Sequence, residues 1–435
     1  MRAHPARGLA AHADATLPLI TGMETPLEIG YVLQNGVPDF TKVSGPLLHI
    51  RAVVQGLRKA GHHVRTVAAR DHGVMWTDDL ESWTNAPYGF SRMPPFRLVE
   101  RPLRRLQYEL GLPYLNLFES IRYADACSQA LRGRTIIYER HGYLGYGGVL
   151  TARRRGVPLV IELNGNIVRE IDAIGIAMSD TQRRIGRWIT RRTLLAADHV
   201  VVVSDALNRE LVERLRIPPN RITTVVNGVD VELFSHARDT LEVRRRYELG
   251  RGPLVTFVGS FQPWHGVDAL VGAFGAVHRR YPEARLLLVG DGEGRENVVA
   301  QLRTTTYADR VVLTGRMLPA QVADIVLASD AVVAPYAYRH DDIVGTPLKL
   351  MEYMAAGKAI VATTAHIHEI VEHGRTGLRV EPASADALAA GILTVLDDAH
   401  LRARLGNAAR AHVQQFSWDA VVQKLLAVFA AVTSR

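Results

Sequence analysis

Residues 342–362 read DIVGTPLKLMEYMAAGKAIVA and describe one helix followed by a buried strand. Thr346 and Pro347 fit a helix start, with the threonine as N-cap and the proline at the first helical position. The Ala-Ala-Gly that ends at Gly357 fits a helix stop, and the apolar run 359–362 predicts a strand covered on both faces. A helix that leads into such a strand is typical of a doubly wound α/β domain.

The start of this helix also predicts an anion site. The amides of Leu348 and Lys349 are free at a helix N-terminus, where negative charge is stabilised, and the Lys349 side chain adds a cation. Glu352 lies about one turn further along, and its carboxylate can accept hydrogen bonds from both hydroxyls of a vicinal diol such as ribose. We therefore expect this helix to hold a diphosphate and a ribose.

The same alternation of strands and helices extends in both directions. In the second half, the candidate strands are 254–259, 285–289, 311–313, 331–334, 359–362 and 377–380. In the first half, they are 27–33, 63–68, 134–138, 158–163, 198–203 and 222–226. Strands separated by helical stretches indicate mostly parallel sheets with helices on both faces. The sequence thus predicts an α/β protein with two Rossmann-like domains, whose ligand crevices at the carboxyl ends of the strands face a common cleft.

Domain limits follow from this rhythm. We expect a flexible leader over 1–24, an N-terminal domain over 25–235 and a C-terminal domain over 236–415. Residues 416–435 carry apolar residues at helical spacing and predict a helix that docks elsewhere. Residues 75–130 do not continue the alternation of strands and helices and contain several tryptophans, prolines and arginines. This segment forms either substrate loops or an extra segment on the surface.

Two loops after strands of the second half are candidate ligand contacts. The glycines of 290–294 (GDGEG) either let the backbone approach a phosphate or form a tight turn, and their spacing differs from the dinucleotide fingerprint, which argues against NAD. Gly259 and Ser260 end the strand 254–259, leaving His265 and free amides facing the cleft. His265 either contacts a ligand or caps and packs the next helix.

Composition restricts the class of protein. The chain has 435 residues, of which 47% are hydrophobic and 22% charged, as in a globular protein. No stretch approaches the roughly 18 apolar residues of a membrane helix, and no nucleic-acid-binding motif is present. Cys127 is the single cysteine and the N-terminus has no secretory pattern, so we expect a cytoplasmic setting. The net charge of +8 favours a phosphate-bearing substrate or an anionic lipid, although most basic clusters fit solvated helix faces.

Taken in order, these motifs resemble the retaining, family-four glycosyltransferases of group 1, which have the GT-B fold. The segments that carry the resemblance are Gly45-Pro46, Ala197 to Ser204, Asn227 to Asp230, Val258-Gly259, Val289 to Gly292, Pro347 to Lys358, Glu369 to Val371 and Gly374 to Leu378. The similarity runs from about residue 27 to 430, and its specific part lies in the C-terminal half.

The resemblance implies an enzyme that transfers a sugar from a nucleotide diphosphate of UDP or GDP type, with retention of anomeric configuration and without metal or another cofactor. It implies a donor held by the C-terminal domain, an acceptor held by the N-terminal domain, and a last helix that crosses back to the N-terminal domain. The alternatives are a nucleotide-sugar 2-epimerase of the same fold and a donor-binding protein without catalysis.

The resemblance also implies roles for particular residues. Catalytic roles are expected for Lys349, Glu352, His265 and Asn164. Donor-binding roles are expected for Gly45, Gly259, Ser260, Asp291, Gly292, Arg316, Gly345, Thr346, Pro347 and Leu348. Contacts with the sugar or the acceptor are expected for Glu139, His141 and Glu162.

The chain departs from the family pattern in three places. Family members commonly carry two glutamates eight positions apart, and here Glu352 fits the second while Val344 stands at the first. Ser260 and His265 stand where Arg and Lys are usual, and Asn164 stands where a histidine is usual.

The partners expected from these observations are a nucleotide-sugar donor and a sugar, lipid-linked or natural-product acceptor. The basic N-terminal face predicts peripheral contact with an anionic membrane at its inner face. No nucleic-acid partner is expected, and the oligomeric state cannot be inferred from these motifs.

Overall fold

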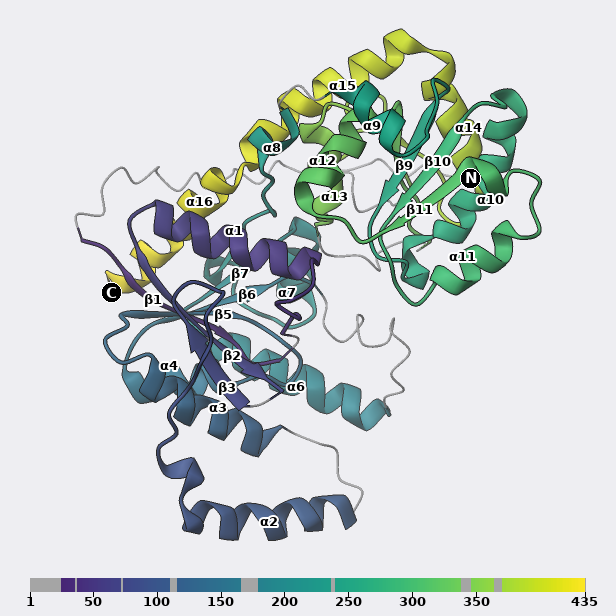
Figure 1. Cartoon of the computed structure of the whole chain (residues 1–435). Helices are drawn as coiled ribbons and strands as arrows, with labels where there is room; N and C mark the ends of the chain where they lie inside the picture. The colour runs from purple at the N-terminus through teal and green to yellow at the C-terminus, as the bar shows by residue number, and fades with distance from the viewer. Residues whose placement is uncertain are drawn as a thin grey trace, which may run out of the picture.

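The structure is a computed structural model that describes residues 25–35, 37–71, 73–109, 116–165, 179–235, 239–337, 346–363 and 370–434. Two separate β-sheets, each with helices on both faces, form the two halves of the molecule (Figure 1). The expected leader lies outside the described residues. None of the helices within these ranges is long and apolar enough to cross a membrane.

The first sheet has eight strands in the order β4-β3-β2-β1-β5-β6-β7-β8. Their bounds are β1 (Glu28–Leu33), β2 (His63–Arg70), β3 (Gly73–Thr77), β4 (Thr84–Asn85), β5 (Ile136–Arg140), β6 (Leu159–Leu163), β7 (His199–Val202) and β8 (Ile222–Thr224). β3 and β4 pair antiparallel at one edge and the other strands are parallel. The chain reverses its direction of advance between β1 and β5, and ligands bind open α/β sheets at the carboxyl ends of such strands.

Helices cover both faces of the first sheet. One face carries α1 (Gly45–Lys59) and α16 (Trp418–Thr433), and the other carries α3 (Leu117–Ala130), α4 (Gly147–Arg155), α6 (Asp180–Ala196) and α7 (Asp205–Glu213). α1 starts as its sequence predicts, because the Ser44 hydroxyl accepts a hydrogen bond from the Leu47 amide and Pro46 occupies the first turn.

The second sheet has six parallel strands in the order β11-β10-β9-β12-β13-β14. Their bounds are β9 (Leu254–Val258), β10 (Arg285–Val289), β11 (Val311–Gly315), β12 (Ala331–Ala334), β13 (Ala359–Ala362) and β14 (Leu378–Arg379). One face carries α8 (Val231–Ser235), α9 (Thr240–Arg246), α12 (Pro319–Ala328), α13 (Leu348–Ala355) and α15 (Ala399–Val413). The other carries α10 (Val267–Arg280), α11 (Arg295–Leu302) and α14 (Ala385–Asp397). In this sheet the switch point lies between β9 and β12.

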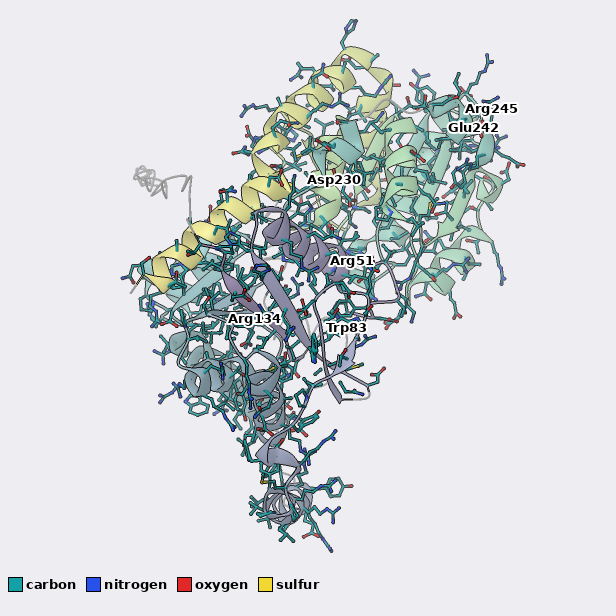
Figure 2. All side chains as sticks on the ribbon, turned by 60° about the vertical axis from the view of Figure 1, so that its left-hand side comes forward. Arg51, Trp83, Arg134, Asp230, Glu242 and Arg245 are labelled. Carbon is teal, nitrogen blue, oxygen red and sulfur yellow. The ribbon has the colours of Figure 1, made fainter. Side chains whose placement is uncertain are left out.

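The last helix joins the two halves. α16 leaves the second domain and lies along α1 of the first domain in both views (Figures 1 and 2). Val422, Leu425 and Phe429 are buried there against the core of the first sheet. The predicted fold class, with two Rossmann-like domains and a final helix that crosses back, is confirmed.

The segment 75–130 is more regular than its sequence suggests. After β4 it forms a short 3-10 turn (Phe90–Arg92), α2 (Pro94–Glu109) and α3, and α3 contributes Tyr123 and Cys127 to the core. Trp83, labelled in Figure 2, packs edge-on against Phe40 in the loop before α1. α2 projects from the lower end of the domain (Figure 1).

Candidate active site

The N-terminus of α13 starts one residue later than the sequence predicts. α13 begins at Leu348, and Pro347, in an extended conformation, is its N-cap. Thr346 is not the N-cap. Its hydroxyl donates a 2.5 Å hydrogen bond to the Val203 carbonyl of the first domain, and its own carbonyl accepts a 2.8 Å bond from Asn227 Nδ2. The capping prediction is therefore wrong, because the Thr346 hydroxyl ties α13 to the first domain and leaves the first-turn amides uncapped by it.

Lys349 is buried and forms no ion pair with any residue that the structure describes. Its Nζ lies 4.3 Å from the ring centroid of Phe257 and 5.1 Å from that of Tyr336. Within the described residues this nitrogen has no hydrogen-bond acceptor. Burial lowers the pKa of Lys349 to about 7, against the opposing charge of Glu352. A buried ammonium that lacks acceptors is costly in the free protein and well suited to take an anion.

Gly259 makes room for this ammonium. A Cβ at Gly259 would lie 2.5 Å from Lys349 Nζ. The backbone φ of Gly259 is +151°, a value that residues with a side chain rarely adopt. The backbone at the end of β9 therefore favours glycine, and a side chain there would displace the Lys349 ammonium.

Glu352 lies one turn along α13 from Lys349 and is partly buried. Burial raises the pKa of Glu352 to about 7, while the charge of Lys349 acts in the opposite direction. The carboxyl group has no hydrogen-bond donor among the described residues, so its oxygens remain available to a ligand.

His265 is held as a neutral ring. Its Nδ1 lies 2.5 Å from the Ser260 carbonyl oxygen, which can only accept, so Nδ1 carries the proton and Nε2 has none. Burial, and then the charge of Lys349, lower the pKa of His265 to about 3. The ring contacts Phe257 and Tyr336 edge-on. His265 therefore adds no positive charge to the free site.

The glycine-rich loop after β10 packs against the loop after β9. A Cβ at Gly290 would lie 1.9 Å from the Gly259 carbonyl oxygen, and one at Gly292 would lie 2.8 Å from the Phe261 nitrogen. Close packing accounts for these glycines without a phosphate. Asp291 accepts a 2.9 Å hydrogen bond from the Gly292 amide.

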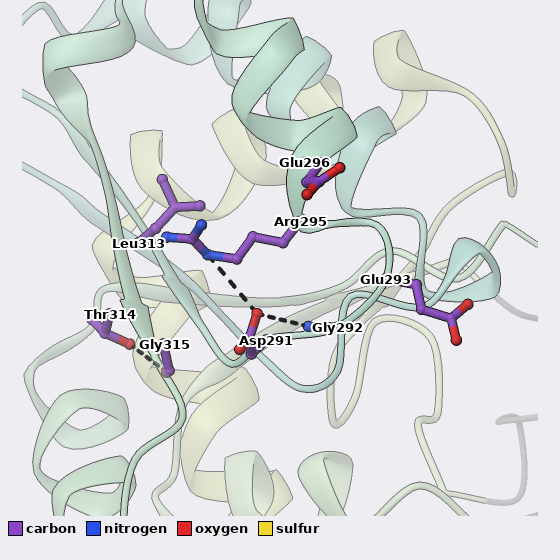
Figure 3. A pocket seen from close by; sticks show the side chains of 8 residues that line it. All are labelled: Asp291, Gly292, Glu293, Arg295, Glu296, Leu313, Thr314 and Gly315. Atoms are coloured by element: carbon purple, nitrogen blue, oxygen red, sulfur yellow. Dashed lines mark hydrogen bonds and ion pairs between the residues drawn. The ribbon is translucent and has the colours of Figure 1, made fainter.

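An open pocket of about 470 Å³ lies beside this loop, at the carboxyl ends of β10 and β11 (Figure 3). Its lining residues are Asp291, Gly292, Glu293, Arg295, Glu296, Leu313, Thr314 and Gly315. Asp291 and Gly292, both expected to bind the donor, thus form part of its wall. Arg316, next in the chain, crosses to the first domain, where its Nη1 donates a 3.3 Å bond to the Val43 carbonyl.

A chain of polar contacts links the first domain to α13. His49 Nε2 lies 2.6 Å from Glu162 Oε1, and His49 Nδ1 lies 2.9 Å from Asn227 Oδ1. The Asn227 amide nitrogen donates to Thr346, so its oxygen must accept from His49. Burial alone would raise the pKa of Glu162, but the charges of His49 and Arg140 lower it to about 2. The His49 ring therefore lies between the carboxylate of Glu162 and the side-chain oxygen of Asn227.

The remaining predicted acceptor residues lie at the carboxyl ends of β5 and β6. His141 Nδ1 lies 3.1 Å from Glu139 Oε1, and both side chains are buried. Several buried polar atoms here have no hydrogen-bond partner among the described residues, namely Glu139 Oε2, His141 Nε2, Glu162 Oε2 and Asn164 Nδ2. Buried polar atoms are normally satisfied, so such a concentration marks a place where a polar ligand or water binds.

The starts of α1 and α13 face each other. Gly45, at the start of α1, lies opposite the first residue of α13, since a Cβ at Gly45 would lie 3.8 Å from Leu348 Cδ1. Two helix N-termini thus meet where the domains touch, and both favour negative charge. Gly345 and Val344 lie outside the described residues.

Sequence reasoning assigned no role to His49, Asn227, Phe257 or Tyr336. His49 is the one polar residue among the buried residues of α1, and this break in its apolar pattern was the available signal. Among the described residues, no group of three or more His, Cys, Asp or Glu side chains is arranged to hold a metal ion.

Comparisons with known proteins identify the family. Residues 43–233 match the family described as Glycosyltransferase Family 4, and residues 252–398 match that described as Glycosyl transferases group 1. A D-inositol 3-phosphate glycosyltransferase of Corynebacterium aurimucosum is 30% identical over 68% of this chain and 71% of its own. A GDP-mannose-dependent alpha-mannosyltransferase of Mycobacterium tuberculosis is 27% identical over 94% of this chain and 98% of its own.

Solved structures agree with the fold. The crystal structure of Anabaena Alr3699/HepE in complex with UDP superposes with a TM-score of 0.70 at 19% identity, over 93% of this chain and all of the other. The two domain matches and the 30% identical relative show that the chain belongs to the group 1, family 4 glycosyltransferases, enzymes that transfer a sugar from a nucleotide-sugar donor and have the GT-B fold.

Proposed function

We propose that the enzyme transfers a sugar from a UDP or GDP sugar to an acceptor hydroxyl with retention of anomeric configuration and without a metal ion. The observation that carries this proposal is the buried, unpartnered ammonium of Lys349 at the uncapped start of α13, opposite the start of α1. A diphosphate there would meet a cation and two helix N-termini, so its charge would be stabilised without a metal.

The other donor contacts follow from the fold. Glu352, one turn from Lys349, would accept hydrogen bonds from both ribose hydroxyls, for which it must be ionised. The pocket beside Asp291 and Gly292 lies further along the carboxyl edge of the same sheet and would take the base. The names of the relatives favour UDP and GDP, because one relative uses GDP-mannose and one solved neighbour holds UDP.

The acceptor would bind on the first domain, near the unpartnered atoms of Glu139, His141, Glu162 and Asn164. In the reaction, the bond between the anomeric carbon and the diphosphate oxygen breaks, and the acceptor oxygen bonds to that carbon from the same face. The acceptor proton passes to the leaving phosphate oxygen. Lys349 and the helix N-termini would stabilise the charge that develops on the leaving group, so catalysis consists of positioning and electrostatic stabilisation.

The acceptor is a sugar, a lipid-linked sugar or a natural-product intermediate. A lipid-linked acceptor would place the enzyme at the surface of an anionic membrane.

Two experiments test this proposal. Thermal shifts with UDP, GDP, ADP, TDP and CDP identify the nucleotide, because a ligand that binds only the folded protein raises its stability. The matching nucleotide sugars are then incubated with an acceptor panel, with and without EDTA, and the product anomer is read by NMR. Release of nucleotide only with acceptor, a retained anomer and no effect of EDTA are expected. An inverted product would refute retention, loss of turnover in EDTA would refute metal independence, and a new nucleotide sugar formed without acceptor would indicate an epimerase.

A matched pair of variants tests the site. Lys349→Met is expected to abolish the nucleotide shift, whereas Lys424→Met, at an exposed position of α16, is expected to leave it unchanged. Equal shifts in both variants would remove Lys349 from the donor site.

A further inference from the structure

α2 touches the rest of the protein along one side only. It projects from the lower end of the first domain in both views (Figures 1 and 2). On its inner side, Phe96 packs edge-on against Phe118 of α3, with ring centroids 6.0 Å apart. Glu100 is buried beside them and accepts hydrogen bonds from Arg104 and Arg122. These contacts fix the helix to α3 and decide which side faces outward.

The outer side of α2 is apolar. Leu98, Val99, Leu103 and Leu106 recur at helical spacing, and between 47% and 73% of each residue is exposed. Of the eleven large apolar residues that are exposed in the described part of the chain, eight lie between residues 90 and 117. Exposed apolar residues scattered singly need no explanation, but a continuous row on a projecting helix marks an interaction surface.

Exposed cations stand on the same helix as this row. Arg97 and Arg101 are exposed, stand one turn apart, and form no ion pair with any described residue. A helix with an apolar face and arginines at its border is the arrangement that binds in the plane of an anionic membrane, with its apolar side chains below the headgroups. Two copies of this face would bring the unpaired arginines of both chains together, which disfavours self-association.

The position of α2 suits an enzyme whose acceptor is carried by lipid. α2 packs on the start of α3, which is tied to the loops at the carboxyl ends of β1 and β5. Gln34 Nε2 donates a 2.8 Å bond to Ser120 Oγ, and Asn116 Nδ2 donates a 3.1 Å bond to the Leu144 carbonyl. The geometry points to α2 as a docking helix for anionic membrane, through the row Leu98, Val99, Leu103 and Leu106 and the exposed cations Arg97 and Arg101. Docking does not require the proposed donor chemistry, and only its use for a lipid-linked acceptor rests on the proposed function.

Co-sedimentation of the full chain with vesicles tests this inference. Vesicles of phosphatidylcholine alone are compared with vesicles that contain about 30% phosphatidylglycerol, at about 50 and about 500 mM NaCl. Binding is expected to the anionic vesicles and to weaken at high salt. Leu98→Gln/Leu106→Gln is expected to weaken vesicle binding about tenfold or more, since two apolar side chains no longer enter the membrane. Arg97→Gln/Arg101→Gln is expected to remove the preference for anionic vesicles.

The matched control is Leu241→Gln/Leu318→Gln, which changes two exposed leucines of the second domain and is expected to bind as the wild type does. Equal vesicle binding by the α2 variants and the control would overturn the inference, as would binding independent of phosphatidylglycerol. A wild-type dimer in sedimentation velocity that dissociates in Leu98→Gln/Leu106→Gln would instead assign the surface to a second copy. Nucleotide thermal shifts of the same variants are expected to be unchanged, so a failure of docking is distinguishable from a failure of the donor site.

Discussion

Lys349 shows how a single residue can serve binding at a cost to stability. Its ammonium is buried beside two aromatic rings and has no hydrogen-bond acceptor among the residues that the structure describes, so its charged form is costly until an anion such as a diphosphate binds. Lys349→Met keeps the volume and removes the charge. We expect its free energy of unfolding at pH 7 to rise by up to about 4 kcal/mol, because the pKa of Lys349 is lowered from 10.5 to about 7 in the folded state and that cost is lost with the lysine. Thermal unfolding without nucleotide measures this change, and a destabilised Lys349→Met protein would contradict it.

The pH dependence of nucleotide binding follows from Lys349 and Glu352. Diphosphate binding needs the charged lysine, whose pKa in the free protein is lowered to about 7, so affinity should fall as the pH rises above about 7. Ribose binding needs the ionised glutamate, whose pKa is raised to about 7, so affinity should also fall as the pH drops below about 7. Isothermal titration at a series of pH values should give a bell-shaped plot of nucleotide affinity against pH. Because Lys349 and Glu352 interact, the two apparent pKa values of this plot describe the two groups together.

Substitutions separate the two limbs of this profile. Lys349→Arg keeps a permanent charge and is expected to flatten the alkaline limb, while Glu352→Gln is expected to flatten the acid limb. A wild-type profile that is flat between pH 6 and 8 would exclude both groups from nucleotide binding.

At this scale local sequence patterns indicate which residues to consider for the site, but not their contacts or their protonation. Lys349, Glu352 and Gly259 were named because a helix start and a strand end have recognisable signals. Thr346 was placed as an N-cap because its hydroxyl partner, Val203, lies 143 residues away and no local pattern reveals it. His49 was missed for the same reason, since Glu162 and Asn227 reach it only through the folded sheet.

The contact between α1 and α16 is the clearest packing constraint at the scale of elements. Gly56 lies in the middle of α1, where alanine would normally favour the helix by about 1 kcal/mol. A Cβ at this position would lie 2.5 Å from Val422 Cγ2 of α16. Gly56→Ala is therefore expected to destabilise the protein by about 1–3 kcal/mol, because the branched valine cannot move aside. Denaturant midpoints measure this effect.

The sign of the effect should depend on the partner helix. In a Val422→Ala background the space is open, and Gly56→Ala is expected to become stabilising. Gly272→Ala in α10, where a Cβ meets only ordinary contacts, serves as the control and is expected to stabilise the wild type. A Gly56→Ala protein as stable as the wild type would show that α16 does not pack tightly on α1.

Helices and strands with a regular apolar pattern can be predicted from the sequence. A segment whose apolar pattern is interrupted by prolines cannot. The strands of both sheets and the start of α1 follow from apolar runs, Ser44 and Pro46. α2 was missed because Pro94, Pro95 and Pro102 argue against a helix. The first two lie in its opening turn, where proline is tolerated, and Pro102 is exposed on its outer side.

At the scale of the whole molecule, Thr346 and Asn227 fix α13 relative to the first domain. Two hydrogen bonds meet at Thr346, one to Val203 and one from Asn227, and Asn227 continues through His49 to Glu162 beneath the expected acceptor site. We therefore expect the position of α13 and the arrangement of the two domains to depend on each other. These contacts join residues that are far apart in the chain, which is why no local sequence pattern predicted them.

Thr346→Val tests this coupling. The substitution keeps the shape of the side chain and removes the hydroxyl that bonds Val203, so the closed arrangement should lose about 1 kcal/mol, or about fivefold in the balance between closed and open forms. Small-angle scattering should then show a larger radius of gyration without nucleotide, and nucleotide affinity should fall by a similar factor. Thr346→Ser, which restores the hydroxyl, should recover both. Thr304→Val is the matched control and should change neither, because the exposed Thr304 hydroxyl donates to the Gln301 carbonyl within the same turn. Scattering and affinity unchanged in Thr346→Val would mean that other contacts hold the domains together and that the chain from Glu162 to Thr346 does not govern closure.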